Sequence, residues 1–233
     1  MTAAIRSLAA RYYTDPQVFK LETEGLLART WQFGCHGSEL AKIGDYATFE
    51  VAGESLFAVR GRDENIRVFY NVCQHRAHQL VSGTGTTRVI VCPYHAWTYE
   101  LTGELRAGPN INTVEGFDKS GICLTEVRAE EFLGFIFVNL DPESAPMEEW
   151  FPNARAELEE WVPNWVDLKP LEWVDIPERC NWKVSVENYS ECYHCSLNHP
   201  TFANGVVKPE TYDIHPQGKC LRHTTECQSL EDM

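Results

Sequence analysis

Two short segments of the chain each bring one cysteine and one histidine together directly after a predicted β-strand. The segment VCQHRAH places Cys73 two residues before His75, and VCPYHAW places Cys92 three residues before His95. Zinc sites of the Cys₂His₂ type usually join a pair of cysteines to a pair of histidines. Here each pair is mixed, so a fold that unites the two segments would draw one thiolate and one imidazole from each loop.

This ligand pattern suits a cluster of two chemically different irons. In a Rieske [2Fe–2S] centre, two cysteines bind one iron and two histidines bind the other, so that each loop reaches both metals. Imidazoles in place of thiolates raise the reduction potential of such a cluster. A zinc site and two unrelated strand ends are the alternatives. His78 is a rival ligand, but the spacing favours His75, and we expect His78 to pack or hydrogen-bond nearby.

Composition narrows the class of protein. A chain of 233 residues that is 43% hydrophobic can bury one large or two small cores. Its formal charge of −14, from 20 basic and 34 acidic residues, argues against nucleic acid and anionic membranes as partners. The sequence has no run of 18 apolar residues, and its first residues lack the pattern of a secretory signal. We therefore expect a cytoplasmic protein.

Nine cysteines in a cytosolic chain of this size favour metal-binding or catalytic thiols over disulfides. Four of them lie beside a histidine within a candidate metal-binding segment: Cys73, Cys92, Cys192 and Cys195. The remaining cysteines are interpreted as small buried hydrophobic residues: Cys35, Cys123, Cys180, Cys220 and Cys227.

Hydrophobic patterning predicts a leading helix followed by a β-rich region. Asp15 and Pro16 are typical of a helix start, and spaced apolar residues extend the predicted helix over residues 15–31. From about residue 45 to residue 140, segments rich in Val, Ile, Phe and Tyr alternate with turn clusters, which indicates an antiparallel sandwich or barrel. The expected strands are 46–52, 55–61, 66–72, 88–92, 95–101 and 132–140.

The pattern becomes mixed after residue 145. Residues 147–162 are helix-like despite Pro152, residues 171–184 begin as a strand, and a helix that ends by Pro200 follows. The last stretch, residues 210–233, is expected to lack a closing strand. The predicted fold class is α+β, with a helical segment over 1–40, an antiparallel β domain over 41–145 and the beginning of a mixed α+β domain over 146–233.

A second group of potential metal ligands lies in the segment ENYSECYHCSLNH. Two histidines and one carboxylate form the facial triad of iron(II) oxygenases, which leaves coordination positions open for oxygen and substrate. If residues 183–195 are helical, Glu191 and His194 share one face. Because Pro200 removes His199 from helical geometry, we expect the helix to break or bulge between the two histidines. The interleaved Cys192 and Cys195 are then expected to point elsewhere and pack.

The segments CQHRAH, CPYHAWTYELTGEL and NWKVSVENYSECYHCSLNHP, in this order, resemble the large subunits of the Rieske non-haem iron oxygenases, and the resemblance covers nearly the whole chain. It implies a Rieske [2Fe–2S] cluster and a mononuclear non-haem iron(II). The implied ligands are Cys73, His75, Cys92 and His95 for the cluster and His194 and His199 for the iron. The family's third iron ligand is a later aspartate, expected beyond Met233, because Asp213 and Asp232 lie in no matching motif.

The resemblance also implies partners. In the family, an NAD(P)H-dependent flavin or iron–sulfur reductase supplies electrons to the cluster, which passes them to the iron of the next subunit of a homotrimer, where O₂ is activated. Glu191 would link the two centres, since His95 of one subunit would hydrogen-bond Glu191 of the next and Glu191 would orient His194. The catalytic domain that begins within residues 146–233 would be helix-grip-like, with residues 1–40 packed on it.

Details of the second segment point to a branch of the family. Aromatic-ring dioxygenases commonly carry aspartate where Glu191 stands. The sequence of this segment instead resembles that of the oxygenases of quaternary ammonium compounds, and most of all that of the stachydrine demethylases. The implied reaction is oxidative N-demethylation of a compound such as proline betaine, glycine betaine or carnitine. Tyr189, Tyr193 and Trp182 are candidates for an aromatic wall that attracts a cation. An aromatic-ring-hydroxylating dioxygenase and a Rieske electron carrier without oxygenase activity are the alternatives.

Overall fold

The computed structural model describes residues 7–217 and 219–228. The chain divides into two compact units, which are described separately. The first, called the β unit here, comprises residues 21–147 and 155–172. The second, called the helical unit, comprises the described parts of residues 1–20, 148–154 and 173–233.

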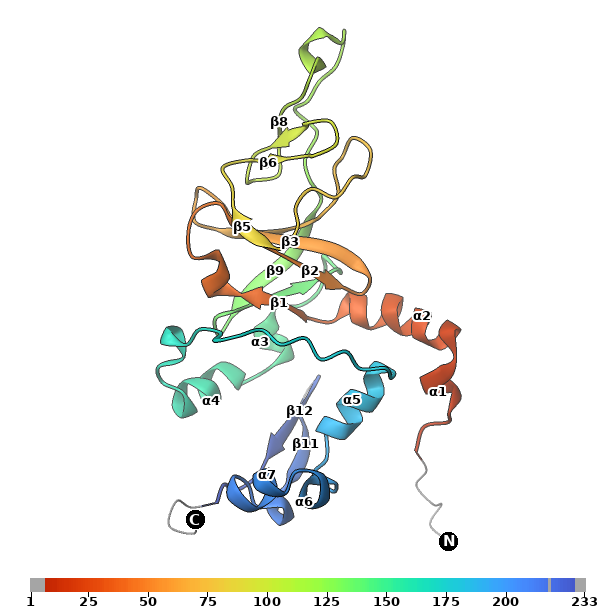
Figure 1. Ribbon diagram of the computed structural model, residues 1–233, viewed down its shortest axis with the longest axis vertical. Helices are drawn as coiled ribbons and strands as arrows, with labels where there is room; N and C mark the ends of the chain where they lie inside the picture. The colour runs from red at the N-terminus through yellow and green to blue at the C-terminus, as the bar shows by residue number, and fades with distance from the viewer. Residues whose placement is uncertain (1–6, 218, 229–233) are drawn as a thin grey trace. The chain divides into compact units, whose positions relative to one another are not determined.

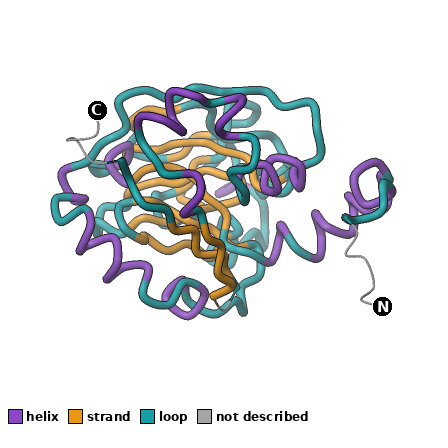
Figure 2. Tube along the Cα trace, turned by 90° about the horizontal axis from the view of Figure 1, so that it is seen from below, coloured by secondary structure: helices purple, strands orange, loops and turns teal. Residues whose placement is uncertain are grey.

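The β unit is built on a seven-stranded sheet with the order β1-β10-β9-β4-β3-β2-β5 (Figure 1). Every neighbouring pair is antiparallel, and Figure 2 shows the strands side by side, in orange. The strands are β1 (Gln32–His36), β2 (Asp45–Val51), β3 (Glu54–Arg60), β4 (Ile66–Tyr70), β5 (Thr84–Thr86), β9 (Glu126–Phe132) and β10 (Phe135–Asn139). A smaller antiparallel sheet consists of β6 (Ile90–Val91), β7 (Thr98–Tyr99) and β8 (Leu105–Ala107).

The large sheet is buried on both faces at β3, because successive side chains of a strand point to opposite sides. Leu56 and Ala58 enter one core with residues of β1, β2, β4, β9 and β10. Phe57 and Val59 enter the other core, which also contains Tyr99, Leu101 and both cysteines of the predicted cluster. The second core therefore joins the large sheet to the loops that carry the first set of candidate ligands.

The antiparallel β region expected between residues 45 and 140 is confirmed, but its strands are more numerous and shorter than the pattern indicated. The strand expected over 132–140 is found as β10 over 135–139, and it is preceded by the end of β9 and a turn at Leu133 and Gly134, which both adopt positive φ (55° and 83°). The strands β1, β5, β8 and most of β9 were not expected. Of these, β5 and β8 have only three residues each, which is too little alternation to be recognised in a sequence.

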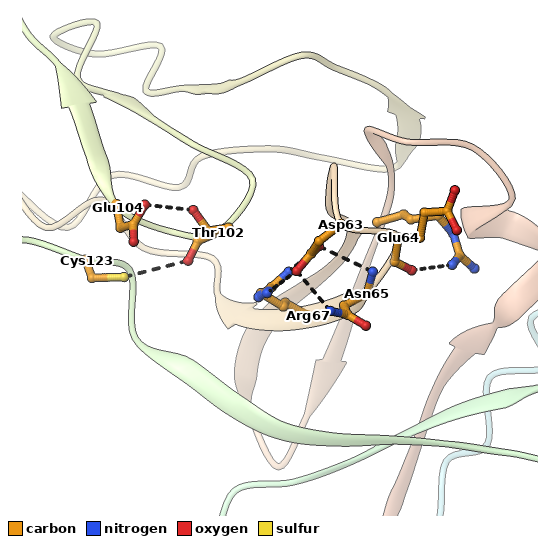
Figure 3. A network of polar contacts seen from close by, with 8 residues as sticks. Asp63, Glu64, Asn65, Arg67, Thr102, Glu104 and Cys123 are labelled. Carbon is orange, nitrogen blue, oxygen red and sulfur yellow. Dashed lines mark hydrogen bonds and ion pairs between the residues drawn. The ribbon is translucent and has the colours of Figure 1, made fainter.

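A polar network fixes the turn between β3 and β4 (Figure 3). The Asp63 carboxylate accepts hydrogen bonds from Arg67 Nη1 at 2.9 Å, Arg67 Nη2 at 2.6 Å and Asn65 Nδ2 at 2.9 Å. The Arg67 guanidinium, followed by Asn65, holds the pKa of Asp63 well below its usual range. In the neighbouring turn, the Thr102 hydroxyl donates to Glu104 Oε2 at 3.0 Å. These turns present polar groups and no candidate ligand.

The helices of the chain are short, and the helical unit also contains one β-hairpin. The α-helices are α1 (Arg11–Thr14), α2 (Pro16–Gly25), α3 (Met147–Trp150), α4 (Ala154–Trp161), α5 (Trp182–Tyr189), α6 (Cys195–Asn198) and α7 (Pro200–Gly205). The 3₁₀ turns are η1 (Leu27–Arg29), η2 (Gly37–Leu40), η3 (Ile111–Thr113), η4 (Trp165–Asp167) and η5 (Pro209–Thr211). The hairpin pairs β11 (Asp213–Gln217) with β12 (Cys220–Thr224). No helix in the part of the chain that the structure describes is both long and apolar enough to span a membrane.

Several sequence predictions for this region need correction. The helix expected over 15–31 starts as predicted, since Asp15 Oδ1 accepts the Gln17 N–H at 2.8 Å, but it ends at Gly25. The strand expected from residue 171 has no pairing partner among the described residues, and residues 171–181 have no regular secondary structure. The hairpin β11–β12 contradicts the expectation that the last stretch lacks a closing strand. Backbone pairing, which the weak alternation of the sequence did not reveal, decides whether these last two segments form strands.

Candidate metal centres

The two candidate ligand loops of the β unit share one backbone conformation. In each loop the cysteine N–H donates to the carbonyl five residues later, and the N–H four residues later donates back to the cysteine carbonyl, all at 2.8–2.9 Å. The residue four positions after each cysteine is an alanine with positive φ, Ala77 at 53° and Ala96 at 54°. Such backbone strain in non-glycine residues concentrates at functional sites. Cys73 and Cys92 therefore head two matching loops.

The four predicted cluster ligands lie together at these loops. Cys73 and Cys92 are each 2% exposed and belong to the same core, and the ring centroids of His75 and His95 are 4.8 Å apart. His95 Nδ1 is buried without a hydrogen-bond partner, which is costly unless a metal uses the lone pair. Desolvation, followed by the neighbouring His75, lowers the pKa of His95 and favours the neutral, metal-binding imidazole. Buried thiols and an orphaned imidazole nitrogen fit a [2Fe–2S] cluster.

Aromatic side chains hold the two histidines. Trp97 stacks on His75, with ring centroids 4.8 Å apart and planes at 12°. Tyr94 lies over His95 at 3.7 Å between centroids. His78 donates through Nδ1 to the Gln79 carbonyl at 2.6 Å and contacts the Tyr94 ring, which is the packing role expected for it. His78 Nδ1 is therefore already used in a hydrogen bond to the protein.

An apolar hollow of about 540 Å³ adjoins the histidine side of this centre. His75 and His95 form part of its wall, while the two cysteines do not. Its remaining lining consists of Pro93, Tyr94, Ala96, Trp97, Pro109, Asn110, Ile111, Val114 and Phe117. The imidazoles, rather than the thiols, are therefore the side of the centre that a partner can approach.

Glu191 and His194 lie on the turn between α5 and α6 in the helical unit, and His199 lies between α6 and α7. The helix expected over 183–195 ends at Tyr189, before the first candidate ligand rather than between the two histidines. The Tyr193 N–H donates to Glu191 Oε2, whereas in a continuing helix it would donate to the carbonyl of residue 189. A carboxylate that takes this N–H stabilises the turn, and this explains the early break.

Glu191 orients His194 within this turn. His194 Nδ1 donates to Glu191 Oε1 at 2.7 Å, and this bond is the main cause that lowers the pKa of Glu191. With its Nδ1 proton engaged, His194 has the Nε2 lone pair free for a metal. The rings of His194 and His199 are 5.4 Å apart, and both line a pocket of about 390 Å³. Two imidazoles, one of them oriented by a carboxylate, fit two of the three ligand positions of a mononuclear iron site.

The structure supplies two ligands for this site and no third. Within residues 7–217 and 219–228, no three His, Cys, Asp or Glu side chains converge closely enough to hold a single metal ion. Asp213 pairs with His215 Nε2 at 3.0 Å on β11 and does not line the pocket. Asp232 lies outside the described residues. The residues present therefore fit two positions of a facial triad.

The pocket wall is aromatic, but only one of the three expected side chains contributes to it. Tyr189 lines the pocket, whereas Tyr193 is 97% exposed and Trp182 does not line it. Sequence reasoning missed three further lining residues: Phe202, Tyr212 and His223. Tyr212 Oη lies 2.8 Å from His223 Nδ1 and 3.2 Å from the Tyr189 carbonyl, so β12 and α5 meet at this wall. The segment KPETYDI gave no periodic signal that would have identified Tyr212.

The cysteines outside the cluster depart from their predicted roles. Cys192 and Cys195 form a disulfide and do not simply pack, and Cys192 lines the pocket. Of the five cysteines interpreted as buried hydrophobic residues, only Cys35 is buried; Cys123, Cys180 and Cys227 are exposed and Cys220 is intermediate. Cysteine count and neighbours did not reveal these environments, because burial depends on distant elements.

Comparisons with known proteins agree with this arrangement of two centres. The model of the Rieske [2Fe-2S] domain matches residues 30–118, and that of the ring hydroxylating alpha subunit (catalytic domain) matches residues 165–231. The carnitine monooxygenase oxygenase subunit of Escherichia coli (strain K12) is 45% identical over 201 residues, which cover 86% of this chain and 54% of the relative. The chain belongs to the Rieske oxygenase alpha-subunit family.

Two further comparisons match a glycine betaine monooxygenase subunit and a quaternary ammonium Rieske monooxygenase. The glycine betaine monooxygenase oxygenase subunit of Chromohalobacter salexigens is 34% identical over 211 residues, which cover 89% of this chain and 46% of the relative. A quaternary ammonium Rieske monooxygenase, solved for insights into carnitine oxidation and inter-subunit electron transfer, superposes with a TM-score of 0.84 at 41% identity, covering 89% of this chain and 57% of that chain. The chain spans about half the length of the curated relatives it matches.

Family membership confirms the α+β fold class, with an antiparallel Rieske domain followed by a ring-hydroxylase catalytic domain. The two domains imply the two cofactors expected from the sequence, a Rieske [2Fe–2S] cluster and a mononuclear iron. The residue assignments to these cofactors and the domain boundaries at 1–40, 41–145 and 146–233 stay predictions.

Tyr99 is a residue of the cluster region that sequence reasoning missed. Its side chain is fully buried, its hydroxyl accepts the Gln74 N–H at 3.0 Å, and the same oxygen lies 3.2 Å from Cys73 Sγ. Since the backbone bond uses an oxygen lone pair, the hydroxyl proton is available to donate to the sulfur. Burial, followed by this contact with Cys73, raises the pKa of Tyr99, which keeps the proton in place. The signal was present in the sequence as a tyrosine four residues after His95.

We predict that Tyr99→Phe lowers the reduction potential of the cluster without reducing its content. A hydrogen bond to a cluster sulfur stabilises the reduced form, and loss of about 1 to 1.4 kcal/mol corresponds to roughly 40–60 mV for one electron. A redox titration followed by EPR measures the shift. Tyr94→Phe is the matched control, because the Tyr94 ring lies over His95 and its hydroxyl bonds no sulfur among the described residues. An unchanged potential in Tyr99→Phe would exclude this role.

Proposed function

We propose that the complete subunit is a Rieske oxygenase that uses O₂ and reductase-supplied electrons to hydroxylate an N-methyl group of a quaternary ammonium compound. The observation that carries the proposal is the pocket in which His194 and His199 share a wall with aromatic side chains while Glu191 holds His194. The identities to carnitine and glycine betaine oxygenases support the substrate class. Proline betaine remains a candidate on the resemblance of the sequence.

The proposal assigns a role to each candidate ligand. The assigned ligands are Cys73, His75, Cys92 and His95 for the cluster and His194 and His199 for the iron. When bound, the cluster stores one electron at a time and the iron binds O₂. Glu191 is the positioning residue between them, because its carboxylate fixes the tautomer and direction of the His194 ring.

The proposed reaction balances with two electrons and two protons. One oxygen atom of O₂ enters a C–H bond of the N-methyl group, and the other leaves as water. The N-hydroxymethyl product then breaks its carbon–nitrogen bond, which releases formaldehyde, a proton and the tertiary amine. The source of electrons is NAD(P)H, acting through a flavin or iron–sulfur reductase.

The proposed assembly is a homotrimer in which the histidine side of one subunit's cluster meets Glu191 of the next. The apolar hollow beside His75 and His95 supports this, because it opens the imidazole side of the centre to a partner. The solved relative studied for inter-subunit electron transfer supports the same arrangement. The proposal places the subunit in the cytoplasm, where NAD(P)H is available to its reductase.

An aromatic wall explains how the pocket would hold a permanent cation. Tyr189, Phe202 and Tyr212 line it, and none of the lining residues is Lys or Arg. A quaternary ammonium group over such rings gains about 0.5 to 2 kcal/mol of cation–π attraction, more where water is excluded. A neutral aromatic hydrocarbon would gain none of this charge-dependent attraction.

The test is a substrate panel on the full-length subunit with a reductase and NADH. Proline betaine, glycine betaine and carnitine are compared with naphthalene, and O₂ uptake, formaldehyde and ring-hydroxylated products are measured. Formaldehyde in proportion to O₂ with a betaine supports the proposal. Dihydroxylation of naphthalene alone would make the enzyme an aromatic-ring dioxygenase. Reduction of the cluster with no O₂ uptake on any substrate would indicate an electron carrier.

Two tyrosines four residues apart give a matched pair of variants for the cation site. Tyr189→Leu is expected to raise KM for the betaine substrate by about 2- to 30-fold, which corresponds to the cation–π energy above. Tyr193→Leu, at a side chain that is 97% exposed and does not line the pocket, is expected to leave KM unchanged. Equal KM values in both variants would contradict the aromatic wall.

A further inference from the structure

The turn that presents Glu191 and His194 is closed by a covalent bond. Cys192 and Cys195, whose Cα atoms are 5.0 Å apart, are joined by a disulfide that encloses only Tyr193 and His194. In the proposed cytoplasmic location, disulfides are rare, and those that occur are usually transient, catalytic or redox-sensing. A bond at this place is therefore unlike an ordinary structural cross-link.

The two sulfurs of this bond have different surroundings. Cys192 is partly exposed and lines the same pocket as His194 and His199. Cys195 is 5% exposed, begins α6 and does not line the pocket. Opening the disulfide would therefore deliver one thiol to the pocket that holds the two histidines and leave the other thiol buried away from it.

The identity of the metal depends on which donors the pocket offers. With the disulfide closed, the described donors are imidazole nitrogen and carboxylate oxygen, a set that suits non-haem iron(II). With the disulfide open, Cys192 adds a soft thiolate to two imidazoles. Two histidines and one cysteine are a ligand set that binds zinc. The redox state of one bond thus decides between a donor set for iron and a donor set for zinc.

We propose that Cys192–Cys195 is a reversible disulfide that keeps this pocket selective for iron by withholding the Cys192 sulfur from the metal. Two thiols and one hydrogen peroxide give the disulfide and two waters, and two equivalents of a cellular thiol reduce it again with formation of their own disulfide. The inference rests on the proposed function, since that function assigns the iron to His194 and His199. It adds a modification site and a metal-selection role to the same turn.

The test compares the metal preference of defined redox states of the full-length subunit, freed of metal by chelation and kept anaerobic. One sample is oxidised with hydrogen peroxide and the other is reduced with a phosphine, and differential alkylation with mass spectrometry reports the state of Cys192 and Cys195. Zinc and iron(II) are then titrated separately and in competition. The reduced form is expected to bind zinc more tightly than the oxidised form, by roughly tenfold or more. Loss of an outer-shell partner alone already lowers the affinity of a metal site by about that factor.

Two variants separate this role from a purely mechanical one. Cys195→Ser and Cys192→Ser both abolish the disulfide. Cys195→Ser leaves the Cys192 thiol in the pocket, whereas Cys192→Ser leaves the Cys195 thiol buried outside it. Under reducing conditions, Cys195→Ser is expected to bind zinc like the reduced wild type, and Cys192→Ser like the oxidised wild type. Cys180→Ser, at an exposed free cysteine, is the control and is expected to match the wild type in both states.

Three outcomes would overturn the proposal. These are equal zinc affinity of the two wild-type states, equal zinc affinity of Cys192→Ser and Cys195→Ser, and failure of hydrogen peroxide to form the Cys192–Cys195 disulfide. If a variant does not fold, the two wild-type states still decide. Failure of the proposed function is a separate result. A subunit that is inactive as an oxygenase, but whose Cys192→Ser and Cys195→Ser variants still differ in zinc affinity, would support the metal-selection role alone.

Discussion

A His95→Ala subunit will lose the Rieske cluster while it keeps the mononuclear iron site. Among the described residues, His95 Nδ1 is a buried nitrogen without a hydrogen-bond partner. Replacing His95 therefore removes the assigned cluster ligand and breaks no hydrogen bond of this nitrogen. Acid-labile sulfide and the EPR signal of the reduced cluster should fall below about a tenth of wild type, and oxygenase activity should fall roughly 100-fold or more, since electrons enter through the cluster. The measurements are iron, sulfide and EPR after dithionite reduction.

Two further variants test whether ligation, rather than general damage, explains this loss. His78→Ala removes a histidine three residues after His75 that already bonds the Gln79 carbonyl, and it should retain the cluster. His95→Cys restores a ligand of another kind, so a cluster should return with a potential shifted toward the roughly −400 mV of four-cysteine clusters. A cluster that survives in His95→Ala, or that is lost in His78→Ala, would reverse the ligand assignment.

The sequence predicted the parts of the two centres that depend on close neighbours in the chain. Cys73 and His75 are two residues apart, so one loop must place them together whatever the rest of the fold does. The pairing of Glu191 with His194 was expected from helical spacing and is found on a turn, because three residues bring the side chains within reach in either conformation. Short spacing is robust to an error in the secondary structure.

The residues that the sequence did not reveal are those that distant segments bring together. Tyr99 reaches the sulfur of Cys73 across 26 positions, and Tyr212 and His223 reach the iron pocket from the hairpin β11–β12. Their positions follow from strand pairing and core packing, which local propensity does not encode. The disulfide was missed for another reason, since Cys192 and Cys195 were expected to point away from the ligands of a helix and to pack, and that helix ends earlier.

A Glu191→Gln subunit will retain both metals and transfer electrons between them about 10- to 100-fold more slowly, the cost typical of losing an outer-shell carboxylate. The carboxylate has two acceptor oxygens and a negative charge, and Oε1 accepts the His194 Nδ1 proton at 2.7 Å. Glutamine has one acceptor oxygen, which can retain His194, but its amide nitrogen cannot accept a second imidazole proton. The link to the partner's cluster is therefore lost while the His194 ring stays in place.

The decisive measurement is a single turnover of the reduced, fully loaded trimer with O₂ and substrate, which isolates transfer between the centres from delivery by the reductase. Glu187→Gln is the matched control, because this carboxylate lies one turn earlier on α5 and accepts the Tyr13 hydroxyl at 2.6 Å. It should leave the single-turnover rate unchanged. If Glu191→Gln also keeps the wild-type rate with both metals present, electrons do not pass through this carboxylate, and its contact with His194 serves only to hold the ring for the iron.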